Sequence, residues 1–290
     1  MRTLGRNINL YLMDSDPKER IKATLANWTG VAYKIPRTAI EKSRSIAALK
    51  QSGVYFLFGT DEETDKDIVY IGQANLRSNG NGVLERVNDH RKDPAKDYFT
   101  EAVIFTTSND SFGSTEISYL ENQFYRMAER ANRYETQNKE EPSKGNLTEE
   151  KESELLEFID NAKSIMGAMG YKVFEPYVSQ TSDSTLNTEH LRFNYRDLEA
   201  TGQRTSEGFV VFAGSQLSPT MVASASETAR RFRRQYADQI NDDFILTEDA
   251  LLTSPSAAAG FVGGANLSGN ITWVNSEGDT LKDIENQETT

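Results

Sequence analysis

Two short segments in the first half of the chain, GVYFLFG at residues 53–59 and IVYIG at residues 68–72, are dense in aromatic and β-branched residues. Such residues favour β-strands, and the acidic segment TDEETDKD between them has the composition of an exposed loop. The pattern predicts an antiparallel hairpin. A third strand is predicted at EAVIFTTS, residues 101–108, after an intervening helix over residues 82–93.

A longer helix is predicted over residues 114–134, where apolar residues recur three and four positions apart, as on a buried helix face. These residues are Ile117, Leu120, Phe124, Ala128 and Ala131. Glu121 lies four residues after Ile117 and three before Phe124, on the same inward side. A buried carboxylate needs a partner. A cation would serve, and the alternative partners are Arg130 and Arg133, farther along the chain.

The pattern of predicted strands and helices along the whole chain indicates an α+β fold. It divides the chain into four segments. Residues 1–50 form a strand-rich basic preface, in which a helix opened by Pro36 is predicted over residues 36–51. The main module covers residues 51–145, and a helical connector with a polar linker covers 146–205. Residues 206–290 are predicted to form a small α+β domain, with alternating residues in GFVVFAGSQ and a basic helix in SETARRFRRQYADQ.

Composition places the chain among globular proteins, because 37% of its 290 residues are hydrophobic and 26% are charged. The chain has no cysteine, which excludes disulfides, thiolate nucleophiles and cysteine-based zinc sites. A bound metal would be held by oxygen ligands or by His90 or His190, the two histidines. Oxygen ligands favour hard cations such as Mg²⁺ or Mn²⁺.

The net charge of -12 argues against a protein that coats nucleic acid indiscriminately. The charge is uneven, however, since residues 1–50 carry +6 and the later segments are all acidic, so the preface could face phosphates. No apolar run approaches the roughly 20 residues that span a bilayer. The first residues also lack the apolar core of a secretory signal. We therefore expect a cytoplasmic protein without a membrane partner.

The candidate chemical groups are Tyr55 and Tyr70 on the predicted hairpin, Arg86 and His90 four residues apart on the first helix, and the inward Glu121. Phosphodiester hydrolysis requires a group that deprotonates water, a cation for the phosphoryl oxygens and a Lewis acid. Each role has a candidate in this set. Taken singly, each residue also has an ordinary reading, as a core tyrosine, a solvated helix arginine or a surface histidine.

The segments GVY at 53–55 and YIG at 70–72, followed by an arginine-bearing helix and a glutamate after leucine, resemble the GIY-YIG nuclease superfamily. The resemblance covers about residues 50–140. It implies a three-stranded antiparallel sheet flanked by helices, and cleavage of DNA with one divalent metal ion, Mg²⁺ or Mn²⁺.

Carried over by position, the resemblance assigns a role to each candidate residue. Tyr55 and Tyr70 match the two motif tyrosines, one of which assists water, and Gly72 matches the glycine that closes the second motif. Read from the residues alone, Gly72 is either a bulge glycine or a point of close phosphate approach. Arg86 matches the arginine that contacts phosphate. The remaining matches are His90 with a histidine of the restriction-enzyme branch, Glu121 with the single metal ligand, and Asn138, chosen over Asn132, with a late asparagine near the site.

The flanking segments carry two further resemblances. The preface is similar to an N-terminal extension of a bacterial subgroup of these proteins, and the end of the chain is similar to a C-terminal domain of unknown function often joined to it. The expected protein is thus a metal-dependent endonuclease that acts on DNA. The alternatives are a ribonuclease and a non-cleaving DNA- or RNA-binding protein built on a degenerate module.

The segment RRFRR, residues 230–234, clusters four guanidinium groups beside Phe232. They belong to Arg230, Arg231, Arg233 and Arg234. Such a cluster is a candidate phosphate- or DNA-binding surface. The alternative is a solvated helix face that pairs with Glu227 or Asp238, since the surrounding segment is acidic. His190 has no motif around it and is assigned to structure.

Overall fold

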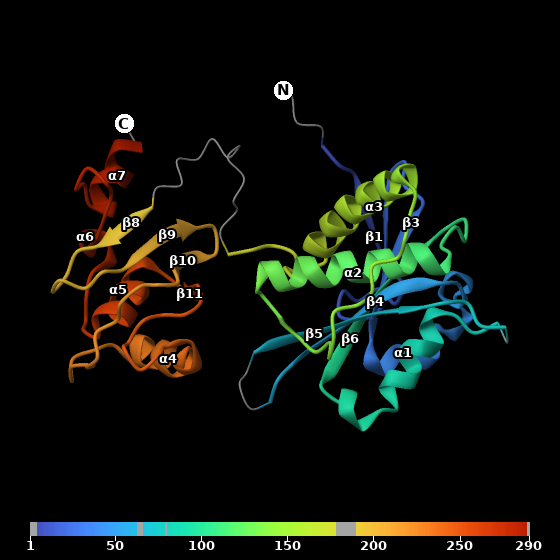
Figure 1. Ribbon diagram of the computed structural model, residues 1–290, viewed down its shortest axis with the longest axis horizontal. Coiled ribbons are helices and arrows are strands. Elements are labelled where there is room, and N and C mark those ends of the chain that lie inside the picture. Colours follow the sequence, from blue (N-terminus) through green and yellow to red (C-terminus); the bar gives the residue numbers. More distant parts are fainter. Residues whose placement is uncertain (1–4, 63–65, 79, 178–189, 289–290) are drawn as a thin grey trace. The chain divides into compact units, whose positions relative to one another are not determined.

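The structure is a computed structural model that describes residues 5–62, 66–78, 80–177 and 190–288. The chain divides into two compact units, Met1–Pro176 and Tyr177–Thr290, and each has its own sheet with helices packed on it (Figure 1). Over the described residues the chain forms seven α-helices together with its strands, which makes the fold class α+β. The division differs from the predicted segments, because the preface, the main module and the first part of the connector share one unit.

The first unit is built on a seven-stranded mixed sheet in the order β1-β2-β3-β6-β4-β5-β7. The strands are β1 (Ile8–Leu12), β2 (Ile21–Leu25), β3 (Gly30–Pro36), β4 (Gly53–Thr60), β5 (Asp67–Ala74), β6 (Phe99–Thr107) and β7 (Glu135–Thr136). Neighbouring strands are antiparallel except for the short parallel pair of β5 and β7. The sequence therefore located the central hairpin and the third strand correctly.

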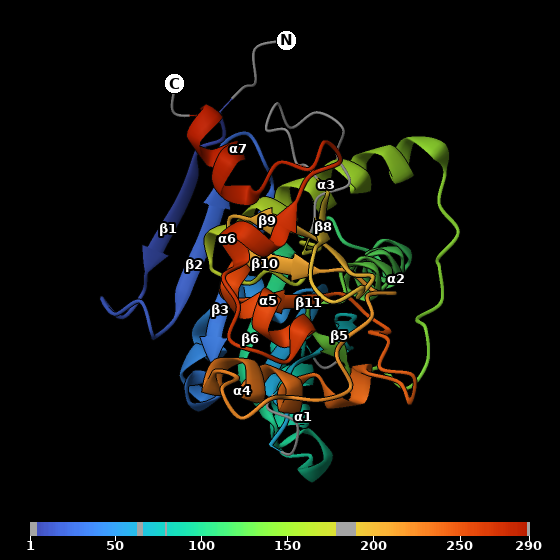
Figure 2. The same cartoon turned by 90° about the vertical axis from the view of Figure 1, so that its left-hand side faces the viewer.

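The predicted three-stranded sheet is only the middle of this larger one. Strand β3 pairs with β6 along its whole length, from Gly30 opposite Thr107 to Pro36 opposite Glu101. Strands β1 and β2 continue the sheet beyond β3 (Figure 2). The preface is thus continuous with the main module, because the free edge of β6 is covered by a strand from the preface.

Residues 36–51 do not form the predicted α-helix. They form three 3-10 turns, η1 (Arg37–Ala39), η2 (Glu41–Ser45) and η3 (Ala47–Lys50). The inward positions are 40, 43, 46 and 49, every third residue, and Ile40, Ser43 and Leu49 are fully buried. A 3-10 helix has three residues per turn, so this spacing keeps one side of the segment on the core.

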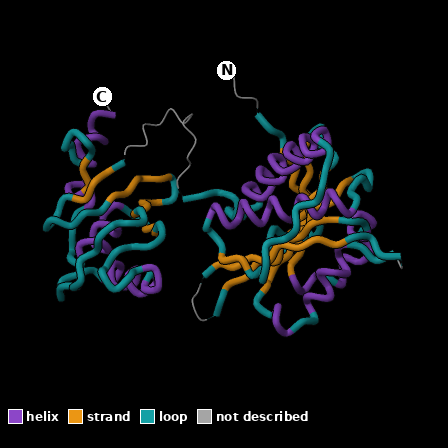
Figure 3. Tube along the Cα trace, in the orientation of Figure 1, coloured by secondary structure: helices purple, strands orange, loops and turns teal. Residues whose placement is uncertain are grey.

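Alternation along the central strands sends side chains to two separate cores, with helices on both faces of the sheet (Figure 3). Helices α2 (Ser114–Ala131) and α3 (Glu149–Ala168) cover the face that receives Val54, Phe56 and Phe58. Helix α1 (Val83–Arg91) and the 3-10 turns cover the opposite face, which receives Tyr55 and Leu57. The predicted helices over residues 82–93 and 114–134 correspond to α1 and α2.

The second unit has a five-stranded antiparallel sheet in the order β11-β10-β9-β8-β12. Its strands are β8 (Leu191–Phe193), β9 (Thr201–Thr205), β10 (Gly208–Val211), β11 (Ala250–Leu252) and β12 (Trp273–Val274). Its helices are α4 (Glu227–Gln235), α5 (Pro255–Gly263), α6 (Gly269–Thr272) and α7 (Leu281–Glu288), with a 3-10 turn η5 (Ala237–Gln239) after α4. Trp273 is fully buried in the core of this unit.

Candidate active site

The hairpin of β4 and β5 places the two motif tyrosines on the face covered by α1. Tyr55 lies directly opposite Gly72, and Leu57 lies opposite Tyr70, so the two phenols are diagonal neighbours with ring centroids 6.2 Å apart. Gly72 is required for this arrangement, because a Cβ atom there would lie 2.4 Å from both Cζ and Oη of Tyr55. The β4–β5 register is regular through Gly72, so this glycine is not a bulge.

We predict that Gly72→Ala lowers the free energy of unfolding by about 1–3 kcal/mol, the usual effect of overpacking a core. Tyr55 cannot retreat easily, because it is only 1% exposed and hydrogen-bonded at its hydroxyl. Chemical denaturation measures the effect, with Gly5→Ala as the control, since nothing lies within 4 Å of a Cβ at Gly5. In a Tyr55→Leu background the same Gly72 substitution should be much less destabilising; equal effects in both backgrounds would contradict the steric explanation.

Tyr55, Tyr70 and His90 form a compact aromatic group. The hydroxyl of Tyr55 and Nε2 of His90 lie 2.8 Å apart, and the His90 ring is 5.6 Å from the Tyr55 ring and 5.3 Å from the Tyr70 ring. Burial, with the positive charges of Arg86 and Lys96, lowers the pKa of His90 to about 4. The imidazole is therefore neutral at pH 7, and Nε2 can accept the proton of the Tyr55 hydroxyl.

The two phenols differ in their access to solvent. Tyr55 is buried, whereas Tyr70 is partly exposed. Burial raises the pKa of both hydroxyls, Arg86 opposes this increase at both, and the neighbouring Tyr55 hydroxyl also opposes it at Tyr70. Both phenols thus remain protonated at neutral pH, and the partly exposed Tyr70 lies beside Tyr55, which contacts the imidazole.

Two cations stand beside these rings. Arg86 is on α1, one turn before His90, and its charge acts on both phenols, on His90 and on Glu121. Lys96 belongs to the 3-10 turn η4 (Pro94–Lys96) after α1, and its Nζ lies 3.4 Å from the centroid of the Tyr70 ring. Burial lowers the pKa of Lys96 to about 8. Because this value is still above 7, the ammonium group is mainly positively charged at pH 7, on one side of the site.

Glu121 reaches the site from α2, on the other side of the sheet. Burial raises the pKa of its carboxyl to about 7, while hydrogen bonds from the side chain and main chain of Gln73 and the charge of Arg86 oppose that increase. The Glu121 charge in turn raises the pKa of Tyr55 and Tyr70, which places it within electrostatic range of both phenols. Arg130, one of the alternative partners from the sequence, is exposed on the last turn of α2.

The carboxylate of Glu121 lies at the edge of β5. Three different groups face successive main-chain positions along this edge. The main-chain oxygen of Val69 accepts from Gln137 N at 2.8 Å. At Ile71 the side chain of Asn138 takes over, with Oδ1 accepting from Ile71 N at 3.0 Å and Nδ2 donating to Ile71 O at 2.8 Å. At Gln73 the next group along this edge is the carboxylate of Glu121, whose pKa the main chain and side chain of Gln73 lower.

Asn138 has a structural contact beside the catalytic role predicted for it, which stays a prediction. Both polar atoms of its side chain are engaged by the main chain of Ile71, between Tyr70 and Gly72, so it holds the motif strand in place. The other predicted residues, namely Tyr55, Tyr70, Arg86, His90 and Glu121, are brought together.

The sequence reasoning missed two residues of this group. Gln73 follows the YIG motif directly, and alternation along β5 places it on the face opposite Gly72, toward α2. This alternation can be read from the sequence, so the position of Gln73 could have been predicted. Lys96 lies in the irregular segment after α1, where no periodicity indicates its direction. Only the folded backbone brings it over the Tyr70 ring.

The four arginines predicted as a phosphate- or DNA-binding cluster lie on helix α4, and that role stays a prediction. Arg233 donates to the main-chain oxygens of Phe261, Ser218 and Val262, and burial lowers its pKa to about 10.

The other three members of that cluster also have internal contacts. Arg230 donates to two main-chain oxygens, the nearer being that of Val222 at 2.7 Å, and Arg234 forms an exposed ion pair with Glu227 at 2.8 Å. Arg231 lies over the ring of Phe232, 5.0 Å from its centroid. Arg230 and Arg233 thus tie α4 to neighbouring segments of its unit, whereas Arg231 and Arg234 contact residues of α4 itself. The pair of Arg234 with Glu227 is the one that the alternative reading expected.

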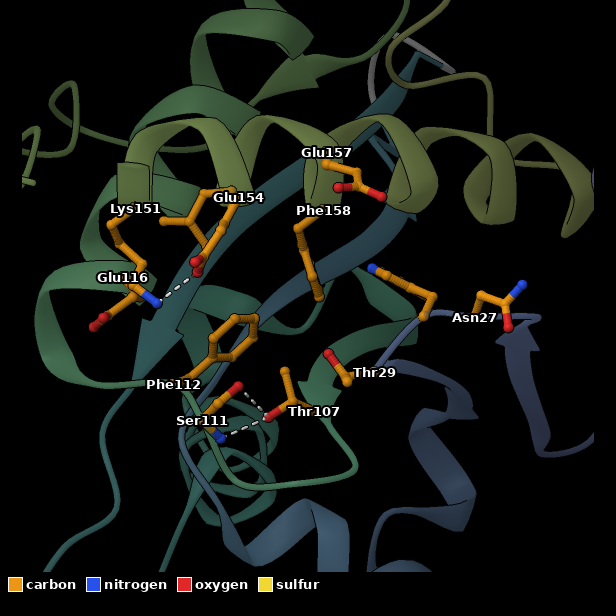
Figure 4. A pocket seen from close by; sticks show the side chains of 12 residues that line it. Asn27, Thr29, Thr107, Ser111, Phe112, Glu116, Lys151, Glu154, Glu157 and Phe158 are labelled. Carbon is orange, nitrogen blue, oxygen red and sulfur yellow. Dashed lines mark hydrogen bonds and ion pairs between the residues drawn. The ribbon is translucent and has the colours of Figure 1, made fainter. Parts of the chain in front are cut away.

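A cavity of about 250 Å³ lies elsewhere in the first unit, between α3 and the strand ends near Trp28 (Figure 4). Phe112 and Phe158 line it together with carboxylates, and Glu154 is held by Lys151 at 2.6 Å. The residues that line it do not include those of the tyrosine site. Within the described ranges, no cluster of three or more histidine or carboxylate residues could hold a metal ion. Likewise, no described helix combines the length and apolar character needed to cross a membrane.

Comparison with known proteins gives one match. A family model described as a domain of unknown function, DUF4357, matches residues 191–285. The match begins at β8 and ends within α7, so it covers most of the described residues of the second unit. No curated protein and no solved structure matches the chain.

Proposed function

We propose that the protein is a metal-dependent endonuclease that hydrolyses phosphodiester bonds in DNA through a GIY-YIG-type site. The observation that carries this proposal is the convergence of the two motif phenols with His90, Arg86 and Glu121, from two strands and two helices, around the Tyr55–His90 hydrogen bond. The choice of DNA rests on the resemblance of the GVY and YIG segments to that superfamily.

The hydrogen-bonded aromatic group supports a route for the proton of the attacking water. Tyr70 is the phenol that solvent can reach, and it lies beside the buried Tyr55, whose hydroxyl lowers the pKa of Tyr70. Tyr55 in turn lies 2.8 Å from Nε2 of the neutral His90. In this mechanism Tyr70 receives the proton of water as its own passes to Tyr55, and the Tyr55 proton passes to the imidazole.

The two cations serve the phosphate. Arg86 presents a planar guanidinium that suits two phosphoryl oxygens, and Lys96 adds a point charge above Tyr70. Charge that develops on the phosphoryl oxygens in the transition state would be stabilised by both.

The oxygen groups at the edge of β5 fit a small hard cation. Glu121 supplies one carboxylate, and the amide oxygen of Gln73 is buried and without a hydrogen-bond partner in the described structure. Such an ion, when bound, supplies Lewis-acid stabilisation of the phosphoryl and leaving oxygens.

Incubation of the full-length protein with supercoiled plasmid tests the proposal. We expect nicked or linear product with Mg²⁺ or Mn²⁺ and no product when a chelator is present. A parallel reaction with a labelled RNA duplex and single strand distinguishes a nuclease of DNA from one of RNA. Retention of DNA on the protein without cleavage in any metal would overturn the proposal and favour the non-cleaving binding protein.

A further inference from the structure

The cavity beside α3 is lined by three aromatic rings that the proposed reaction does not use (Figure 4). The Phe158 ring contacts both others, with its centroid 4.8 Å from that of Trp28 and 5.0 Å from that of Phe112. Phe112 and Phe158 are buried and Trp28 is partly buried, so the rings form one apolar wall. The volume of about 250 Å³ equals that of roughly eight water molecules at about 30 Å³ each, which suits a small ligand.

The position of Trp28 is fixed by the tight turn between β2 and β3. Asn27 has a φ of 58°, in the left-handed region that asparagine tolerates. The indole lies directly against Gly30, where a Cβ atom would be 2.1 Å from Cζ2 of Trp28. Only glycine leaves room for the indole at this place. The ring is therefore already on the wall of the cavity before a ligand binds, so binding does not require it to be ordered.

Acidic side chains surround the aromatic wall. Glu116 belongs to the first turn of α2, and Glu154 and Glu157 are exposed on α3. Among the described residues that line the cavity, Lys151 is the one cation, and it pairs with Glu154 at 2.6 Å. Glu157 has neither an ion pair nor a hydrogen bond with any described residue. The lining thus has three carboxylates against one ammonium group, and Glu157 is the carboxylate available to a ligand.

We propose that this cavity binds a small organic cation, with a guanidinium or alkylammonium head near Glu157 and an aliphatic body against the three rings. The faces of aromatic rings carry partial negative charge and attract such cations. Their apolar surface favours a carbon-rich ion over a hydrated inorganic one. No group of three or more carboxylates among the described residues could hold a metal ion, which also favours a larger cation. The cavity shares no lining residue with the tyrosine site, so the proposal is independent of nuclease activity.

Titration of the full-length protein with propylguanidinium at constant ionic strength, followed by tryptophan fluorescence, tests the proposal. Trp28 lines the cavity, whereas Trp273, the other tryptophan, is fully buried in the second unit. We expect a saturable change in fluorescence that is lost in Trp28→Phe. N-propylurea has the same shape without the charge, and should bind at least about tenfold more weakly. A signal that persists in Trp28→Phe, or equal binding of the two compounds, would overturn the proposal.

Two variants assign the binding to the charge and to the rings. Glu157→Gln should weaken the binding of propylguanidinium about fivefold without affecting N-propylurea, because it removes only the charge. Phe112→Leu keeps an apolar side chain but loses an aromatic face, and should weaken binding of the cation about threefold. Thermal unfolding shows that each variant is folded.

The matched control is Glu149→Gln, which removes an exposed carboxylate of the same helix outside the cavity lining. It should bind propylguanidinium as the wild type does. A loss in Glu149→Gln equal to that in Glu157→Gln would show general attraction to an acidic surface and overturn the site. Wild-type affinity in folded Glu157→Gln or Phe112→Leu would do the same.

Discussion

Glu121→Gln is expected to reduce Mg²⁺-dependent cleavage of plasmid DNA by about a thousandfold or more. The substitution keeps the shape of the side chain and an acceptor for Gln73, but it removes the single negative charge that the site offers to a cation. Metal ions supply several kcal/mol of transition-state stabilisation, and each 1.36 kcal/mol corresponds to about a tenfold change in rate. The initial rate of nicking, measured with saturating Mg²⁺, gives the result.

The same variant should not be less stable than the wild type. Because burial raises the folded-state pKa of Glu121 above its unfolded value, ionisation of this group favours the unfolded chain at pH 8 in the absence of metal. Glutamine removes that unfavourable charge. The control is Glu129→Gln, since Glu129 is on the exposed side of α2. Cleavage by Glu121→Gln at the wild-type rate would refute the assignment of this carboxylate.

The central part of the fold could be predicted because its hydrophobic pattern is strong. Strands β4, β5 and β6 are rich in aromatic and β-branched residues, and the stripe on α2 repeats at the helical period. The expected hairpin therefore has its predicted pairing, with Tyr55 next to Gly72. The extension of the sheet by β3 could not be predicted in the same way, since local pattern does not determine which strand covers a free edge.

One domain boundary and one helix differ from the prediction for identifiable physical reasons. The predicted start of the last domain at residue 206 falls in the turn between β9 and β10, which are antiparallel partners in one sheet. Strand β9 reads TGQRT, without the hydrophobic alternation that marks a half-buried strand, so composition gave no signal for it. The segment after Pro36 was predicted as an α-helix because a proline opens it, but a proline at the first position does not distinguish an α-helix from the 3-10 turns that form there.

The site was predictable as far as residue types on regular elements determine it. Arg86 and His90 are four apart on one helix, and their common direction follows from the helical period. The close contact between Gly72 and the Tyr55 ring, however, depends on where that ring lies. The burial that lowers the pKa of His90 depends on packing between separate elements. The sequence therefore indicated which groups meet but not which phenol is exposed or how each group is charged.

Arg86→Gln is expected to reduce the cleavage rate by at least about a hundredfold, the usual effect of removing one preorganised donor from a developing negative charge. Arg86→Lys should fall between this variant and the wild type, because lysine keeps the charge but lacks the planar pair of donors. The matched control is Arg91→Gln on the same helix. Arg91 pairs with Glu41 at 2.6 Å, so its loss should change the cleavage rate little.

A second measurement separates the electrostatic role of Arg86 from a general loss of structure. The positive charge of Arg86 contributes to the low pKa of His90, so its removal should raise the pKa of that imidazole above about 4. The chain has two histidines, which makes the imidazole titration straightforward to follow by nuclear magnetic resonance. A His90 pKa that does not change in Arg86→Gln, together with cleavage at the wild-type rate, would place Arg86 outside the site. A raised pKa with slowed cleavage is the result that one shared phosphate-binding centre requires.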